Sequence, residues 1–85
     1  MLLEIALTRD AAKELARLPA TDRERVERRI EAYAEAPEAP GPDVIALAGA
    51  RGLYRLRSGD WRVIFELEEE RMRILSVKHR REAYR

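Results

Sequence analysis

A regular alternation of side-chain types over residues 53–67 constrains the fold of this chain more than any other feature. Apolar or aromatic side chains recur at every second position, first Tyr54 and Leu56, then Trp61, Val63, Phe65 and Leu67. A period of two places successive side chains on opposite faces of a β-strand. Between the two runs lies 58–60, Ser-Gly-Asp, whose residue types suit a tight turn. We therefore predict an antiparallel hairpin with one buried face.

Arg62 is unusual in this hairpin. It follows Trp61 directly and shares the second face with Ile64 and Glu66, where a purely structural hairpin more often carries Thr or Val. A cation at this position requires an anionic partner. The partner is either a neighbouring glutamate in a salt bridge or an anionic ligand.

The first part of the chain predicts one strand and one helix. The run 1–7 is apolar enough for a buried strand, and Thr8 is a suitable N-cap for a helix that Pro19 ends. The apolar face of this helix is expected to contain Ala11, Ala12, Leu15 and Leu18.

A second helix is predicted to begin at a capping box, in which Thr21 and Glu24 each bond the other's backbone N–H. Its apolar face is Val26, Ile30 and Tyr33, at spacings of four and three residues. The opposite face alternates Arg and Glu, which is typical of a solvated helix surface.

The segment 37–42 contains three prolines and a glycine and breaks both helix and sheet. Ile45 to Arg51 is expected to be a short connection to the hairpin. After the hairpin, 68–70 form an acidic turn and Met72 to Lys78 alternate as a third strand. The two predicted faces of that strand are Met72, Ile74 and Ser76 against Arg73, Leu75 and Val77.

These elements predict an α+β fold, in which one strand and two helices precede an antiparallel meander of three strands. Both helices are expected on one face of the sheet, so the other face remains open. A chain of 85 residues forms one domain, 1–85. No apolar run approaches the roughly 18 residues of a membrane span, so we expect a cytoplasmic protein.

Charge is distributed unevenly along the chain. Residues 1–43 contain 7 basic and 10 acidic side chains, a balance of −3, whereas 44–85 contain 10 and 6, a balance of +4. All basic residues except Lys13 and Lys78 are arginines, which bind phosphate through a planar fork. The absence of cysteine and a single histidine argue against a metal site or another cofactor. The open face is thus expected to form a cationic groove that suits a phosphate backbone.

Two segments, YRLRSGDWRVIFEL and VKHRREAYR, resemble the RelE/ParE superfamily, the toxin halves of bacterial type II toxin–antitoxin pairs. The shared pattern is a basic strand, a glycine-containing turn, an aromatic followed by Arg, and a terminal basic group followed by Tyr. The resemblance extends over the whole chain, and the order of elements agrees with the fold of the family.

In the RelE branch, the resemblance implies an endoribonuclease that enters the ribosome and cleaves messenger RNA without a metal. Arg62 matches the arginine after the turn aromatic, Arg80 matches the arginine of the closing strand, and Tyr84 matches the tyrosine that stacks on or orients the base. Arg55 occupies a position where several relatives have lysine. The resemblance therefore implies Arg55, Arg62, Arg80 and Tyr84 as catalytic residues.

The remaining basic residues of the second half receive supporting roles. Arg57, Lys78 and Arg81 are expected to hold the ribosomal or messenger backbone. His79 is the one side chain with an ordinary pKa suited to acid–base catalysis, but strand alternation sends it to the face opposite Lys78 and Arg80. It therefore remains either a catalytic acid or base or a structural histidine, and Tyr84 has the alternative of packing on the core.

Two other functions remain open. The ParE branch shares the fold, inhibits DNA gyrase and generally lacks the arginine and tyrosine set. A silent binding module of the same fold is the second alternative, since Arg55 replaces lysine and the net charge is only +1. The toxin interpretations imply a cognate antitoxin, with which the chain would form a complex such as a heterotetramer, and the nuclease interpretation adds the ribosome and messenger RNA.

Overall fold

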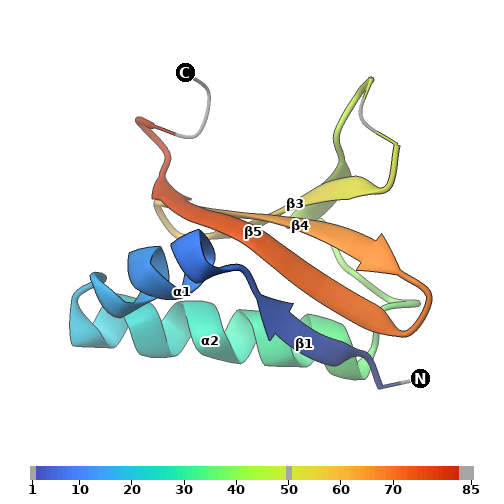
Figure 1. Ribbon diagram of the computed structural model, residues 1–85, viewed down its shortest axis with the longest axis horizontal. Coiled ribbons are helices and arrows are strands. Elements are labelled where there is room, and N and C mark those ends of the chain that lie inside the picture. The colour runs from blue at the N-terminus through green and yellow to red at the C-terminus, as the bar shows by residue number, and fades with distance from the viewer. Residues whose placement is uncertain (1, 50, 83–85) are drawn as a thin grey trace.

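Five strands form one sheet with two helices on one side of it in the computed structural model, which describes residues 2–49 and 51–82 (Figure 1). The strand order is β1-β5-β4-β3-β2. The strands are β1 (Glu4–Leu7), β2 (Val44–Ala46), β3 (Leu53–Ser58), β4 (Trp61–Glu68) and β5 (Arg71–His79). β1 pairs with β5 in parallel, and all other neighbours are antiparallel. The predicted α+β fold with both helices on one face is confirmed.

Helix α1 (Arg9–Ala16) begins directly after Thr8, as predicted. The Thr8 hydroxyl accepts a hydrogen bond from the Ala11 N–H at 3.1 Å and donates one to the Leu75 carbonyl at 3.3 Å. A single side chain therefore satisfies a free N–H at the helix start and ties that start to β5. Ala11 and Leu15 are buried, but Ala12, predicted on the same face, is exposed.

Helix α2 (Ala20–Glu35) begins two residues earlier than a capping box with Thr21 as N-cap requires, so the predicted capping box is wrong. Its N-cap is Pro19, which makes no side-chain cap hydrogen bond. The first turn is already closed by the Arg23 N–H, which donates to the Pro19 carbonyl at 2.9 Å. Thr21 therefore lies inside the helix, where its hydroxyl is past the position of an N-cap.

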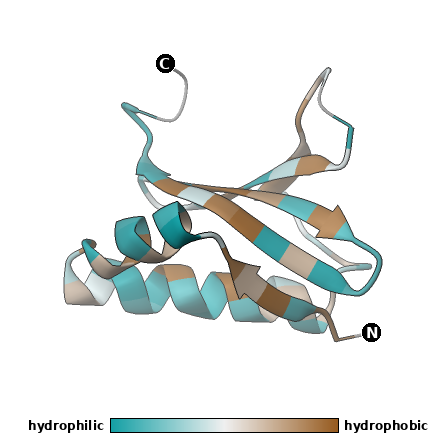
Figure 2. Cartoon of the chain, viewed as in Figure 1, coloured by the Kyte–Doolittle hydropathy of each residue, from teal (hydrophilic) through white to brown (hydrophobic). Residues whose placement is uncertain are grey.

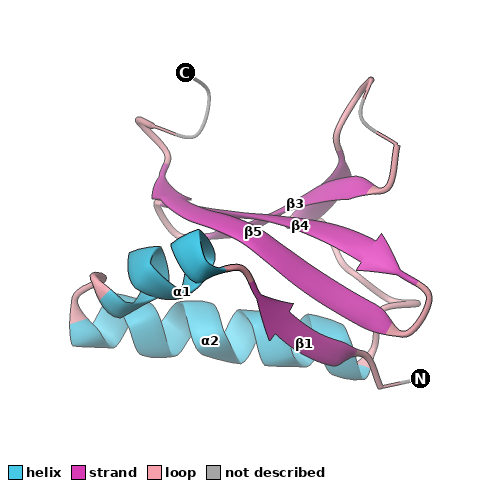
Figure 3. Ribbon diagram, in the orientation of Figure 1, coloured by secondary structure: helices cyan, strands magenta, loops and turns pink. Residues whose placement is uncertain are grey.

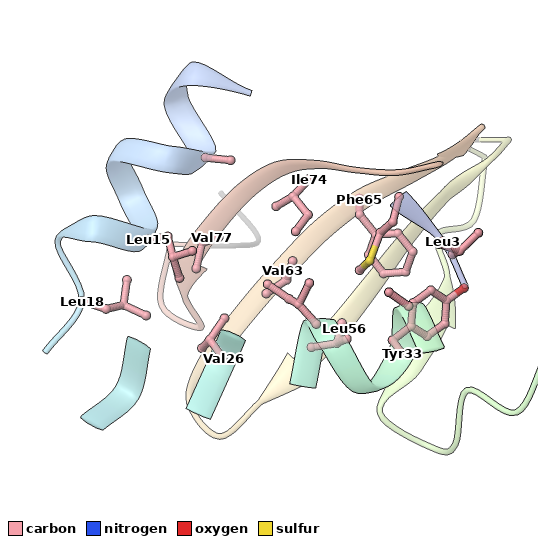
Figure 4. Packing of buried hydrophobic residues seen from close by; sticks show 14 residues of the cluster. Leu3, Leu15, Leu18, Val26, Tyr33, Leu56, Val63, Phe65, Ile74 and Val77 are labelled. Atoms are coloured by element: carbon pink, nitrogen blue, oxygen red, sulfur yellow. The ribbon is translucent and has the colours of Figure 1, made fainter. Parts of the chain in front are cut away.

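The hydrophobic core lies between the helices and the sheet, as Figure 4 shows. Val26, Ile30 and Tyr33 of α2 are buried, as predicted. The rings of Tyr33 and Tyr54 both contact the Phe65 ring, with centroids 5.0 and 5.5 Å away. These contacts join the second helix to the two central strands.

The predicted hairpin is confirmed. β3 pairs with β4 from Leu53 opposite Glu66 to Ser58 opposite Trp61, so two residues form the turn. Gly59 has a φ of 59°, a left-handed conformation that glycine adopts without steric cost. Charged residues recur along β3 and β4 and are interrupted in the middle of β4 by the apolar run Val63, Ile64 and Phe65; Figure 2 shows teal and brown bands on the strands.

The segment Ile45 to Arg51, predicted as a connection, in fact begins within a strand. β2 pairs with β3, with Val44 opposite Leu56 and Ala46 opposite Tyr54 (Figure 3 shows the strands in magenta). Three residues are too few to produce a detectable period of two, and the prolines that precede them favour an irregular reading. The meander therefore has four strands instead of three.

The predicted faces of β5 are wrong beyond Leu75. Ile64 pairs with Ser76 and Phe65 with Ile74, so Leu75 is an extra residue, a β-bulge without a partner on β4. One extra residue reverses the alternation. Val77 is consequently buried on the same face as Ile74, whereas the sequence pattern assigned it to the other face.

The face of the sheet opposite the helices is open. In Figure 1 the connection from β2 to β3 and residues 80–82 after β5 rise on this side, at opposite ends of the sheet. The hydrophobic core on the other face holds both helices against the sheet. One face of the sheet therefore packs the core, and the other is left open. No helix of the described residues is long and apolar enough to cross a membrane.

Candidate nucleic-acid interface

Three cations lie next to one another across the open face, at the end near the β3–β4 turn. Arg57 on β3 pairs with Arg62 on β4, and Arg62 pairs with Lys78 on β5. Directly paired residues have Cβ atoms about 5 Å apart on the same face, and like charges at this spacing repel. We call Arg57, Arg62 and Lys78 the cationic row. Such a row persists only if counter-charges or ligands compensate it.

Asp43 compensates one end of the row. Its Oδ1 accepts hydrogen bonds from Arg57 Nη2 at 2.9 Å and Arg57 Nε at 3.2 Å. Its backbone carbonyl accepts from the Arg57 N–H at 2.9 Å, which continues the β2–β3 pairing by one residue. Arg29 of α2 forms a second ion pair with Asp43 and lies 3.5 Å from the Arg57 carbonyl. The helix pattern predicts a solvated Arg29 side chain, but in the structure this side chain forms an ion pair with Asp43.

Glu14 of α1 compensates the other end. Its Oε2 forms an ion pair with Lys78, and its Oε1 accepts a hydrogen bond from the Val77 N–H at 2.9 Å. The hydrogen bond to Glu14 raises the pKa of Lys78, and the negative charge of the same carboxylate adds to this effect. Lys78 and Arg57, both predicted to hold a nucleic-acid backbone, thus already have carboxylate partners.

Arg62, in the centre of the row, has a different environment. Its Nη1 donates to the Gly59 carbonyl at 2.8 Å and to the Trp61 carbonyl at 3.1 Å. Its Nε is buried and has no hydrogen-bond partner among the described residues. Within residues 2–49 and 51–82, no carboxylate forms an ion pair with Arg62. Glu66, on the same face of β4, instead pairs with Arg73, with 3.5 Å between Glu66 Oε1 and Arg73 Nη1. Neutral carbonyls therefore fix the guanidinium without cancelling its charge.

Arg55 lies on the same open face, two residues from Arg57 along β3. It is half-buried and pairs with Ile64 on β4 and Ile45 on β2. Two residues along a strand correspond to about 7 Å. Arg55 therefore lies next to the cationic row but outside it, between two apolar neighbours.

The segment after β5 is attached to the β3–β4 turn. The Arg80 N–H donates to the Asp60 carbonyl at 2.7 Å, and the Arg80 Nε lies 3.7 Å from Asp60 Oδ1. Arg80 and Arg81 are exposed. The structure thus brings Arg80 to the turn from which Arg62 extends. Tyr84 lies outside the described residues.

His79 lies on the helix side of the sheet, opposite Trp61 of β4. The two rings meet edge to face with centroids 5.3 Å apart, and the His79 Nδ1 accepts from the Arg81 N–H at 3.3 Å. Trp61 and His79 together line two hollows of about 210 and 270 Å³ on this side. His79 is therefore on the face opposite Lys78, as strand alternation predicted, and also opposite Arg62, which pairs with Lys78.

Sequence reasoning missed the two carboxylates that shape this face. Asp43 precedes a strand that was not recognised, and Glu14 belongs to the polar side of α1. A signal for Asp43 exists in hindsight, because it follows the breaker-rich segment and starts a β-branched pair, Val44 and Ile45. No signal identifies Glu14, since its role depends on where α1 lies against β5.

The face can hold an anion but has no metal-binding cluster. Among the described residues, no three His, Cys, Asp or Glu side chains gather at a distance that would bind a metal ion. Fixed guanidinium groups on an open sheet can bind phosphate oxygens through forked hydrogen bonds. The arrangement therefore suits electrostatic binding of a phosphodiester.

Comparison with known proteins identifies one family and one fold. Residues 5–84 match the family model of the ParE toxin of type II toxin–antitoxin system, parDE. No curated protein sequence shows significant similarity to the chain.

Among solved structures, the archaeal RelE–RelB complex from Pyrococcus horikoshii OT3 contains a chain that is 30% identical, with a TM-score of 0.80, and 98% of this chain and 100% of that chain are covered. The intact RelBE toxin–antitoxin complex of E. coli gives 25% identity, a TM-score of 0.73, and coverage of 91% and 95%. The RelB–RelE complex of Methanococcus jannaschii, at 22% identity and a TM-score of 0.76, covers 93% and 94% and shares the fold.

Proposed function

This chain belongs to the RelE/ParE superfamily and is a toxin of a type II toxin–antitoxin system, and we propose that it is a metal-independent endoribonuclease that cuts messenger RNA on the ribosome. The observation that carries this proposal is the environment of Arg62. It lies in the middle of the cationic row, held by two carbonyls and by no carboxylate of the described residues. A fixed, uncompensated guanidinium on an open face is suited to a phosphate that gains charge during reaction.

The chemistry proceeds by attack of the ribose 2′-hydroxyl on the adjacent phosphorus. The 2′-oxygen forms a bond to phosphorus and its proton passes to water, while the bond to the 5′-oxygen breaks and that oxygen takes up a proton from water. Negative charge accumulates on the phosphoryl oxygens as the phosphorus becomes five-coordinate. Arg62 stabilises this charge, and loss of such a preorganised donor costs on the order of 10² to 10³ in rate in other enzymes.

The neighbouring cations supply assistance and positioning. Arg55 lies on the same strand face, and Arg80 is brought to the β3–β4 turn through Asp60. Tyr84 would stack on or orient the base, as in the RelE branch. His79 lies on the other face of the sheet, which argues for a structural role over that of an acid or base.

A chain without an adjacent acid–base pair must obtain much of its rate from geometry. Holding the 2′-hydroxyl in line with the phosphorus can contribute several orders of magnitude. The ribosome and the messenger would set this alignment, so cleavage would require translation. The chain would act in the cytoplasm and would be inhibited by a cognate antitoxin in a complex such as a heterotetramer. Support for that partner comes from the relatives, several of which were solved as antitoxin–toxin complexes.

A second candidate is a ParE-like inhibitor of DNA gyrase. The family model that matches residues 5–84 carries the ParE name, and this observation favours it. The presence of Arg62 and Arg80 on or near one open face favours the nuclease, because the ParE branch generally lacks the arginine and tyrosine set.

Induced expression in a bacterial host, followed by primer extension on a translated messenger, distinguishes these functions. The variant Arg62→Ala, Arg80→Ala removes the proposed cations, and Arg73→Ala is the matched control on the same face. Cuts that require translation, that occur with the unaltered chain and Arg73→Ala and that are lost in the double variant support the nuclease. Growth arrest without cuts supports gyrase inhibition, and no arrest identifies a silent module.

A further inference from the structure

The cationic row carries a pattern of charge that the phosphate-binding role of Arg62 does not require. Going across the sheet, the side chains at one level are Asp43, Arg57, Arg62, Lys78 and Glu14. A carboxylate therefore closes each end of a line of three cations. Both carboxylates reach their positions from outside the central strands, one from the residue before β2 and one from α1.

Each carboxylate is less exposed than the cation it binds. The Asp43 side chain is 27% exposed against 49% for Arg57, and Glu14 is 21% exposed against 41% for Lys78. Each is also held by a second group, Asp43 by Arg29 and Glu14 by the Val77 N–H. Carboxylates fixed in this way stay beside the row, so they compete continuously with any phosphate for Arg57 and Lys78.

We propose that Asp43 and Glu14 are specificity-determining residues that neutralise the ends of the cationic row, so that within this row only Arg62 carries a charge that no carboxylate of the described residues compensates, and free RNA binds weakly. The proposal rests on the function inferred above, in which the ligand is RNA. Non-specific affinity for nucleic acid grows with the number of phosphates that cations neutralise, and each contact also steepens the dependence on salt. Because Asp43 and Glu14 neutralise Arg57 and Lys78, two phosphate contacts are lost. Binding of RNA then depends on the ribosome, which positions the messenger.

The test measures binding of a short 2′-O-methyl oligoribonucleotide, which lacks the nucleophilic hydroxyl, by fluorescence anisotropy at several salt concentrations. Asp43→Asn and Glu14→Gln remove one charge each and keep a side-chain oxygen that can still accept a hydrogen bond, from Arg57 at position 43 and from the Val77 N–H at position 14. Glu66→Gln is the control, because it also removes a carboxylate from the open face but lies in another row, beside Arg73.

We expect each substitution at the row to raise affinity about three- to tenfold and to steepen the salt slope by roughly 0.7, the value for one added phosphate contact on a single strand. Glu66→Gln should change affinity much less. Unchanged affinity in Asp43→Asn and Glu14→Gln, or a gain no larger than that of Glu66→Gln, would overturn the inference.

A double-mutant cycle with Arg57→Gln guards against an indirect effect of misfolding. Arg57→Gln should weaken binding more in the Asp43→Asn background than in the unaltered chain, because only there is the Arg57 charge available to RNA. Equal losses in the two backgrounds would contradict the inference even if melting temperatures differ. Binding that is absent from every protein, or equal in all of them, would overturn this inference, whereas the proposed nuclease fails separately, if the unaltered chain does not cleave messenger RNA on the ribosome.

Discussion

The two faces of the sheet contain residues of opposite character on the same strands. On the helix side, Leu56, Val63 and Phe65 are almost completely buried and none carries a charge. On the open side, their immediate neighbours include Arg57, Arg62 and other charged side chains that remain half-exposed or exposed. Burial of apolar area stabilises a fold, whereas exposed ion pairs contribute little. The fold is therefore held by one face, and the other can change its charges at small cost in stability.

The largest expected effect on stability comes from a substitution on the helix side of the sheet. Phe65→Ala removes a fully buried ring that packs against the rings of Tyr33 and Tyr54, and should lower the free energy of unfolding by about 3 to 5 kcal/mol. Urea unfolding measures it. Ile64→Ala, one residue away on the open face, is the matched control and should cost clearly less. Similar losses for the two variants would contradict the division between the faces.

A smaller effect concerns the attachment of α1 to the sheet. Thr8→Ala removes both the hydrogen bond from the Ala11 N–H and the bond to the Leu75 carbonyl. The expected loss is about 0.5 to 2 kcal/mol, in the range of N-cap substitutions. Thr8→Ser keeps the hydroxyl and should retain most of the stability. If Thr8→Ala melts at the same temperature as the unaltered chain, this tether is unimportant.

Alkaline pH should weaken the helix side in a defined direction. Burial raises the pKa of Tyr33 above its ordinary value of 10.0, and the charge of Tyr54 raises it further. Since the folded state holds this proton more tightly, the contribution to stability is complete below pH 10.0 and falls as pH rises through the raised pKa. Glu14 likewise raises the pKa of Lys78 above its ordinary value of 10.5. The contribution of Lys78 to stability therefore also falls as pH rises through this raised pKa.

Urea midpoints near pH 9 and near pH 11 measure this loss, which follows from the titration of groups with raised pKa values. Tyr33→Phe should reduce the difference between the two midpoints, because phenylalanine does not ionise. An equal difference in the variant and the unaltered chain would remove Tyr33 from the explanation.

The smallest effect compares the two hairpin turns. Gly59 forms the β3–β4 turn with positive φ, whereas Glu69 adopts a φ of 37° in the β4–β5 turn. A side chain with a β-carbon is strained in this region, and Asn tolerates it better. Glu69→Asn should therefore raise stability by less than about 1 kcal/mol. Thermal melting would detect this, and a lower melting temperature would show that Glu69 makes a compensating contact.

The fold was predictable where a short period repeats over several residues. The hairpin and the apolar face of α2 each supply such a period, and both were located correctly. β2 has only three residues, and the bulge at Leu75 inserts one residue without any mark in the composition. Both errors arise because pairing with a neighbouring strand, which the local pattern does not contain, decides the outcome.

The candidate site was predictable in its cations but not in their partners. Strand alternation alone placed Arg57 and Arg62 together on the open face, since each lies one residue from a buried neighbour on its own strand, Leu56 and Val63 respectively. Asp43 and Glu14 come from segments that are distant in the chain, at separations of 14 and 64 residues from Arg57 and Lys78. Only the packed structure shows that these carboxylates meet the row.

We propose that Arg62 serves catalysis and contributes little to folding. The most direct measurement combines two readings on one purified variant, Arg62→Ala: the single-turnover rate of messenger cleavage on programmed ribosomes and the melting temperature. We expect the rate to fall by about 10² to 10³, as for loss of one preorganised donor, while the melting temperature shifts by only a few degrees. A cleavage rate equal to that of the unaltered chain, in a variant that remains folded, would contradict the account.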